Sequence, residues 1–303
     1  MADRKAVLDA RAVTALLMCC FLWGLNQVAV KVALPEIPAL LQAGGRSLIG
    51  ALLVCAWARW RGVALLDADA SLWPGLLAGA LFATEFGAIF LGLQFTTASR
   101  MVVFLYLSPF VVALGMPFVS RSERLAPAQA LGLLLAFAGV AWAFAESLSQ
   151  PAAGPRQWWG DALGVAAAVL WGATTLVIRA SRLNTASAEK TLLYQLGVAG
   201  VALIVVGALT GEVWPASLSP LVAWSFAFQS VIVAFASYLV WFWLIRHYPA
   251  TRLASFTLLT PVFGLLMGAW LLGEPITLRL WVALAGVSAG IVLVNRRGAN
   301  APA

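Results

Sequence analysis

The sequence predicts an all-α polytopic membrane protein, with ten transmembrane helices arranged as two inverted repeats of five helices around a central cavity. Hydrophobic residues make up 62% of the 303 residues and charged residues only 10%, whereas soluble domains carry about 25% charged residues. The apolar residues gather in runs of roughly 20, the length that crosses the hydrocarbon core of a bilayer. The motif Trp23-Gly24 recurs as Trp171-Gly172 in the second half of the chain, which indicates an internal repeat.

The first five spans are expected at residues 12–30, 39–58, 72–93, 99–119 and 128–145. The breaks around them carry prolines or charges, and in order they are Pro35 with Pro38, residues 59–62, Asp67 with Asp69, and residues 120–124. The Pro, Gly and Gln residues of segment 150–157 form the longest break. The first repeat is therefore placed at residues 1–149 and the second at residues 150–303.

The remaining spans are expected at residues 160–180, 191–209, 220–244, 250–272 and 278–295. Because the loops are short, neighbouring helices must be antiparallel. With this arrangement, 14 of the 19 Lys and Arg residues fall on one side of the membrane and four fall on the other. The remaining one, Arg46, lies within the second span. Excess Lys and Arg mark the cytoplasmic side, so both termini are expected in the cytoplasm, with residues 1–11 as a tail and not a signal peptide. The net charge of +7 needs no nucleic-acid partner.

The repeat extends beyond its tryptophan motif. Ser108-Pro109 in the fourth span matches Thr260-Pro261 in the ninth. Because each half has an odd number of spans, the second half must enter the membrane from the opposite face. Two inverted halves, related by a pseudo-two-fold axis in the membrane plane, are typical of transporters that expose a central site to each face in turn.

Enzyme signatures are missing from the sequence, which has no Gly-rich phosphate loop, HExxH motif or nucleophile elbow. Without an ATP-binding motif, transport is expected to be passive or coupled to an ion gradient or substrate exchange. Cys19, Cys20 and Cys55 lie in apolar spans without metal-ligand spacing and are interpreted as packing residues. The single histidine, His247, is expected at the membrane interface. We therefore expect a protein that is not an enzyme and uses no cofactor.

Polar groups at membrane depth are costly to bury and often functional. Glu85 lies in the middle of the third span. It either binds a substrate ammonium group or a proton, or it neutralises a fixed cation such as Arg46 or Lys31. Arg46 is interpreted as a structural residue that pairs with Glu85 or caps helix carbonyls.

Trp23 and Trp171 lie deep in their spans, unlike the tryptophans near span ends, where aromatic belts are expected. Other aromatic and hydroxyl side chains within spans are Tyr106, Tyr238, Trp241, Ser108, Thr257 and Thr260. Together they suit a pocket for a small amphipathic or aromatic solute, the alternative being packing or lipid-facing roles. Pro109 and Pro261 free backbone carbonyls and are expected to bend their helices.

Four glycines on the fifth and tenth spans have small-residue spacing; they are Gly132, Gly139, Gly286 and Gly290. Such spacing lets helix backbones approach closely. These positions therefore predict a packing or dimer face and not a ligand site.

These features together resemble the EamA-type transporters of the drug/metabolite transporter superfamily. The motifs that carry the resemblance are Trp23-Gly24, Arg46 early in the second span, Leu93-Gln94-Phe95-Thr96-Thr97-Ala98, Ser108-Pro109, Glu123, and Leu271-Leu272-Gly273-Glu274-Pro275. Within the superfamily, the chain is similar to YddG-type exporters of aromatic and other amino acids. Glu123 and Glu274 match a family position that resembles a helix-end structural group.

The resemblance implies a basket of ten helices in the bacterial inner membrane that exports amino acids or related metabolites by alternating access. The substrate-binding residues it implies are Trp23, Asn26, Glu85, Tyr106, Ser108, Pro109, Trp171, Thr175, Tyr238, Thr257 and Pro261. A proton-coupled exporter of cationic drugs is the alternative. The expected partners are a small-molecule substrate and the lipid bilayer. The sequence does not specify the oligomeric state, and a monomer is compatible with it.

Overall fold

The computed structural model describes residues 8–65, 67, 69–92, 95–96, 98–120, 126–143, 145, 155–272 and 278–295. These residues form helices and connecting turns, without a strand among them. Six helices are long and apolar enough to cross a membrane, and further apolar helices are shorter. An all-helical polytopic membrane protein is thus confirmed. Glu123 and Glu274 lie outside the described residues.

Seven of the expected spans each correspond to one helix. These helices are α1 (Ala10–Ala33), α2 (Ala39–Trp60), α3 (Leu72–Gly92), α6 (Pro127–Ala143), α8 (Gln157–Ala180), α9 (Ala188–Leu209) and α14 (Leu278–Asn295). A single turn of 3₁₀ helix, η2 (Arg182–Asn184), follows α8. The apolar runs therefore predicted where helices occur to within a few residues.

Two expected spans are divided into shorter helices, and a third, Pro220–His247, is continuous but changes helix type along its length. The pieces are α4 (Ala98–Leu105) with α5 (Ser108–Val119), α10 (Pro220–Ala227) with the π-helix η3 (Phe228–Ser237) and α11 (Tyr238–His247), and α12 (Ala250–Phe256) with α13 (Leu259–Leu272). The breaks before α5 and α13 lie just upstream of Pro109 and Pro261. Proline has no N–H to donate and its ring clashes with the preceding turn, so the expected bends are confirmed. Nothing in the sequence signalled the π-helix.

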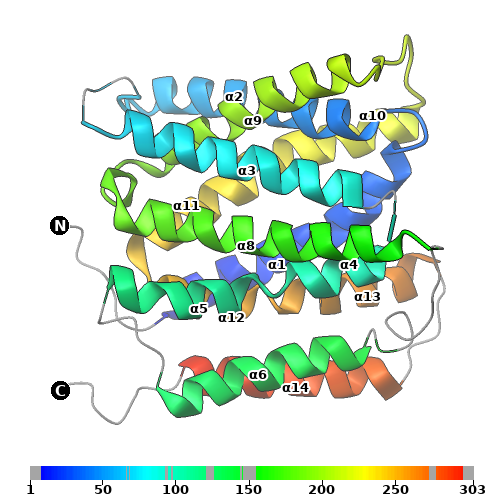
Figure 1. The fold of residues 1–303 in the computed structure, drawn as a ribbon. Helices are drawn as coiled ribbons and strands as arrows, with labels where there is room; N and C mark the ends of the chain where they lie inside the picture. Colours follow the sequence, from blue (N-terminus) through cyan, green and yellow to red (C-terminus); the bar gives the residue numbers. More distant parts are fainter. Residues whose placement is uncertain are drawn as a thin grey trace.

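Helices of the first half-chain pack largely against helices of the second (Figure 1). α2 packs against α9, and α6 packs against α14. α1 packs against α13, while α5 packs against α8. When the two halves are exchanged, the contact of α1 with α13 corresponds to that of α8 with α5, and the contacts of α2 with α9 and of α6 with α14 correspond to themselves. The centre of the molecule is therefore bounded by helices from both halves.

The small-residue stripes on α6 and α14 face each other within one chain. A Cβ atom added to Gly132 would lie 2.8 Å from the carbonyl oxygen of Gly290. A Cβ atom added to Gly286 would lie 3.3 Å from the Cα atom of Gly139. The expected packing face is therefore confirmed, and both of its sides belong to the same chain.

Candidate functional site

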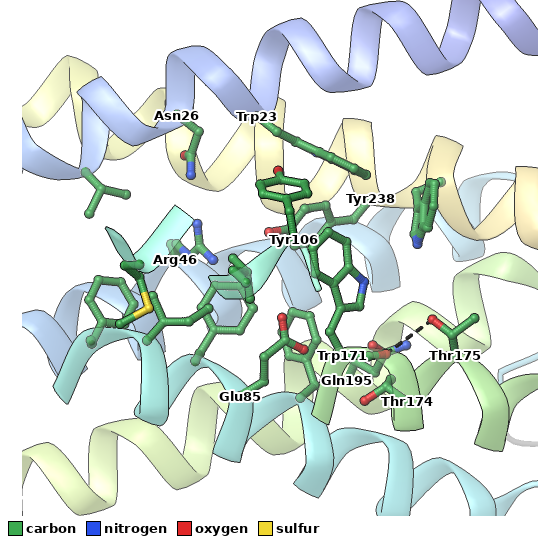
Figure 2. Close-up of a pocket in the computed structure, with 18 of the residues that line it drawn as sticks. Trp23, Asn26, Arg46, Glu85, Tyr106, Trp171, Thr174, Thr175, Gln195 and Tyr238 are labelled. Atoms are coloured by element: carbon green, nitrogen blue, oxygen red, sulfur yellow. Dashed lines mark hydrogen bonds between the residues drawn. The ribbon is translucent and has the colours of Figure 1, made fainter. Parts of the chain in front are cut away.

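A cavity of about 300 Å³ lies between the two half-chains. Small-molecule sites usually measure roughly 300–1,000 Å³. Seven of the eleven residues expected to bind substrate line it, namely Trp23, Asn26, Glu85, Tyr106, Trp171, Thr175 and Tyr238. Figure 2 shows these side chains projecting into one space from helices that are distant in sequence.

The helical repeat explains which residues reach the cavity. On α1, Trp23, Asn26 and Val30 line it, and their spacing of three, then four residues places them on one helix face. On α8, Trp171, Thr174 and Ile178 line it with the same spacing. Corresponding positions of the two halves therefore face the same space.

Aromatic side chains from both halves form much of the cavity wall. The indole nitrogen of Trp23 donates a hydrogen bond of 2.9 Å to the hydroxyl of Ser237. The Trp23 ring meets Trp241 edge-to-face at 5.4 Å between centroids, and Trp171 meets Tyr106 in the same way at 5.8 Å. Each deep tryptophan is thus held by a residue of the opposite half.

Two charged side chains are buried in this aromatic cavity. Arg46 is 1% exposed and Glu85 is 5% exposed. Arg46 lies over the ring of Phe86, with its guanidinium carbon 4.5 Å from the ring centroid. Arg46 and Glu85 interact electrostatically, yet the described structure has no ion pair between them within 4.0 Å.

Several buried polar atoms of cavity-lining residues have no hydrogen-bond partner among the described residues. They are Oδ1 of Asn26, Nε of Arg46 and Oε2 of Glu85. Buried polar groups are almost always paired, so unpaired atoms of opposite charge in one cavity are suited to a ligand. Arg46 was interpreted as a structural residue, and the structure places it in the cavity wall.

Among the described lining residues, both charged ones belong to the first half-chain. α2 and α9 have equal lengths, and Gln195 of α9 stands at the position of Arg46 in α2 and also lines the cavity. Ser237 is the approximate repeat partner of Glu85 and bonds to Trp23. The cavity therefore has a charged side, built from α2 and α3, and an uncharged side.

Four of the expected residues do not line the cavity: Ser108, Pro109, Thr257 and Pro261. They lie at the breaks between α4 and α5 and between α12 and α13. The hydroxyl of Thr257 donates to the carbonyl of Ala254, 2.7 Å away in its own helix. These breaks shape the helices next to the cavity and do not bring the hydroxyl groups into it.

Some lining residues were missed by sequence reasoning, including Phe82, Phe86, Thr174 and Gln195. Phe82 and Phe86 lie three residues before and one residue after Glu85, so helical spacing from that carboxylate could have found Phe82. The length match between α2 and α9 could have found Gln195.

No group of three or more His, Cys, Asp or Glu side chains among the described residues is placed to hold a metal ion.

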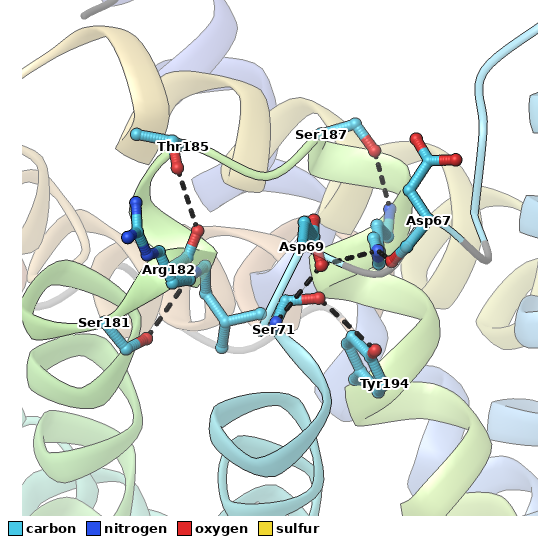
Figure 3. A network of polar contacts seen from close by, with 10 residues as sticks. Asp67, Asp69, Ser71, Ser181, Arg182, Thr185, Ser187 and Tyr194 are labelled. Atoms are coloured by element: carbon cyan, nitrogen blue, oxygen red, sulfur yellow. Dashed lines mark hydrogen bonds and ion pairs between the residues drawn. The ribbon is translucent and has the colours of Figure 1, made fainter.

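Polar networks join the two half-chains near opposite ends of α3. At the start of α3, the Lys190 ammonium lies 2.9 Å from Oδ1 of Asp69 and 2.8 Å from the carbonyl of Asp67 (Figure 3). Beyond its other end, Arg100 forms an ion pair with Asp161, whose carboxylate also accepts a 2.7 Å hydrogen bond from Thr96. α3 has 21 residues, which at ~1.5 Å per residue separates the networks by roughly 30 Å.

Comparison with known proteins agrees with this architecture. Residues 10–145 and 158–296 each match the EamA-like transporter family. The chain is 30% identical to the uncharacterized transporter YvbV of Bacillus subtilis, over 94% of this chain and 92% of that protein. It is 24% identical to the uncharacterized inner membrane transporter YedA of Escherichia coli strain K12, over 93% and 89% of the two chains.

A plant protein and a solved structure extend the comparison. The chain is 26% identical to the WAT1-related chloroplastic protein At3g02690 of Arabidopsis thaliana, over 93% of this chain and 69% of that protein. One crystal structure shares the fold, with a TM-score of 0.78 and 18% identity over 94% and 96% of the two chains. The chain therefore belongs to the EamA-like transporter family and is a multi-pass transporter of the inner membrane, not an enzyme.

Proposed function

We propose that this transporter exports amino acids, aromatic and neutral ones in particular, or related small metabolites, by alternating access through the central cavity. The observation that carries this proposal is the combination of aromatic walls with one buried cation and one buried carboxylate, Arg46 and Glu85. A zwitterion with an apolar or aromatic side chain offers a partner to each of these groups. The cavity volume of about 300 Å³ suits a solute of that size.

The proposed architecture has ten transmembrane helices in two inverted repeats, residues 1–149 and 150–303, with both termini in the cytoplasm. Two observations support it. Each half matches the family separately, and the pattern of helix contacts stays the same when the two halves are exchanged. The bias of Lys and Arg toward one side supports the orientation.

Alternating access is supported by the polar networks at the two ends of α3. Each network joins the two halves, Asp69 with Lys190 at one end and Arg100 with Asp161 at the other. Both networks are formed in this structure, so opening the cavity toward either face by rocking of the halves would break one network and leave the other formed.

A proton-coupled exporter of cationic drugs is the second candidate, because Glu85 is a buried carboxylate in the cavity. Arg46 lines the same cavity, and like charges brought together in a low-dielectric site repel strongly. A substrate with a positive charge alone would meet this repulsion, whereas a zwitterion would not. The amino-acid proposal is therefore favoured.

Counterflow in proteoliposomes tests the proposal. Labelled neutral and aromatic amino acids are screened against cationic dyes, with wild-type protein, Trp171→Ala and Glu85→Gln. We expect exchange of aromatic amino acids that Trp171→Ala reduces. Trp158→Ala is the matched control, because this tryptophan of the same helix is 59% exposed and lies outside the cavity. Dye flux that depends on Glu85, without amino-acid exchange, would favour the drug-export candidate.

A further inference from the structure

We infer that Arg46 binds the carboxylate of the substrate and that Glu85 faces its ammonium group. The site would then select solutes that carry both a free carboxylate and a free ammonium group. This inference rests on the proposed amino-acid transport and assigns the recognition of the head group to two residues of the first half-chain. It also gives Arg46 a binding role in place of a structural one.

The described surroundings of Arg46 leave it without an ion-pair contact. Its side chain is buried, its nearest carboxylate in the cavity is not within ion-pair distance, and its Nε atom has no hydrogen-bond partner. The ring of Phe86 lies against the guanidinium group and partly offsets the burial of the charge. A carboxylate is the ligand group that matches the planar fork of an arginine side chain with two parallel hydrogen bonds.

Glu85 and Asn26 supply acceptors for an ammonium group. Both side chains are more than nine-tenths buried, and each has an unpaired oxygen, Oε2 of Glu85 and Oδ1 of Asn26. Figure 2 shows Asn26, Arg46 and Glu85 directed into the same space from α1, α2 and α3. These three side chains leave polar atoms unpaired. An amino acid placed between them would supply the missing hydrogen-bond partners.

Among the described residues that line the cavity, none beyond Arg46 and Glu85 carries a charge that would compete for these groups. Gln195 and Ser237 stand where a symmetric site would repeat Arg46 and Glu85. The rings of Trp171 and Tyr106, which meet edge-to-face at 5.8 Å, also line the cavity. The substrate side chain would lie among these rings while its charged groups face α2 and α3, so the head group has one orientation.

Matched ligands separate the two charged contacts. The full-length protein in proteoliposomes exchanges labelled phenylalanine, and four unlabelled compounds compete: phenylalanine, phenylalanine amide, 3-phenylpropionate and phenethylamine. In the wild type we expect phenylalanine to compete at least tenfold better than each of the others. In Arg46→Gln the advantage of phenylalanine over its amide should disappear, whereas its advantage over 3-phenylpropionate should persist. In Glu85→Gln the pattern should be reversed.

The controls separate binding from folding. Arg61→Gln makes the same change in the C-cap residue of α2, where the arginine also lies beside an aromatic ring, Trp57, but is exposed; it should behave as wild type. Arg46→Lys keeps the charge and should recover part of the preference for phenylalanine over its amide. Retention of the full wild-type preference in a folded Arg46→Gln protein would overturn the inference and leave amino-acid transport intact. Absence of phenylalanine exchange in the wild type would overturn the proposed function itself.

Discussion

The guanidinium carbon of Arg46 lies 4.5 Å from the ring centroid of Phe86, inside a cavity where the arginine meets no carboxylate at ion-pair distance. A buried charge without a full counter-charge lowers the stability of the empty protein. When the anionic group of a ligand enters the cavity, the same charge stabilises the complex. Stability and binding should therefore respond in opposite directions when this arginine is replaced.

In a Glu85→Gln background, which removes the neighbouring carboxylate, Arg46→Met is expected to raise the free energy of unfolding of the substrate-free protein by about 1 kcal/mol or more, because a buried charge without a counter-charge is removed. The same variant should lose substrate exchange. Thermal unfolding in detergent, followed by tryptophan fluorescence, measures the first effect. Arg61→Met, at an exposed position, should change the stability little. A clear loss of stability in Arg46→Met would mean that the arginine holds the fold together.

Ser237→Ala removes the acceptor for the indole N–H of Trp23. An unpaired buried donor costs about 1–3 kcal/mol, and the freed ring would no longer be fixed against Tyr238 and Trp241. We expect a lower melting temperature and a several-fold weaker affinity for aromatic substrates. Ser230→Ala is the control, because that hydroxyl donates to the carbonyl of Phe226, one turn earlier in the same helical span. Equal effects of the two variants would contradict a positioning role for Ser237.

Gly290→Val is expected to destabilise the protein by about 1–3 kcal/mol, the usual cost of overpacking. The backbones of α6 and α14 meet at Gly132 and Gly290, with no room for a side chain between them. Gly197→Val provides the comparison, since a Cβ atom at that helical position meets nothing within 4 Å. Thermal unfolding of both variants measures the difference. Similar stability of both would show that the contact between α6 and α14 is not needed.

Asp69 should make stability depend on acid pH. Hydrogen bonding from Ser71, followed by the Lys190 ammonium, holds the pKa of Asp69 below its usual value of 3.8. Because the folded pKa is the lower one, the stabilisation is complete above about pH 4 and is lost as the pH falls through the folded pKa. The stability difference between wild type and Asp69→Asn should therefore be constant from pH 7 to 5 and shrink below pH 4.

Asp67→Asn is the matched control for this pH dependence. Asp67 contacts Lys190 through its backbone carbonyl, which the substitution keeps. The control should follow the wild type at every pH. A difference between wild type and Asp69→Asn that does not change with pH would contradict the assignment.

The helices could be predicted from the sequence because lipid imposes a length and a composition on every span. The breaks before α5 and α13 could be predicted from Pro109 and Pro261, which act locally. The π-helix η3 has no comparable local cause in its sequence, so it was not foreseen. Hydrophobic pattern and proline positions thus predict local structure well, and packing decides the rest.

The cavity could be predicted only in part. Trp23 and Trp171 were identified because their depth and their repeat are visible in the sequence. The hydroxyl of Thr257 bonds within its own helix, and the sequence does not show which neighbouring helix covers a given face. Arg46 was assigned a structural role for the same reason, because its distance from Glu85 depends on how α2 and α3 pack.

Accessibility of a single cavity position from each face of the membrane tests alternating access most directly. In a protein whose three native cysteines are replaced by alanine, Thr174→Cys introduces one thiol into the cavity wall. A membrane-impermeant maleimide is applied to each side of sealed vesicles, with and without phenylalanine. Alternating access predicts labelling from both sides, slowed by substrate in each case. Labelling from one side alone, in a variant that still exchanges substrate, would contradict it.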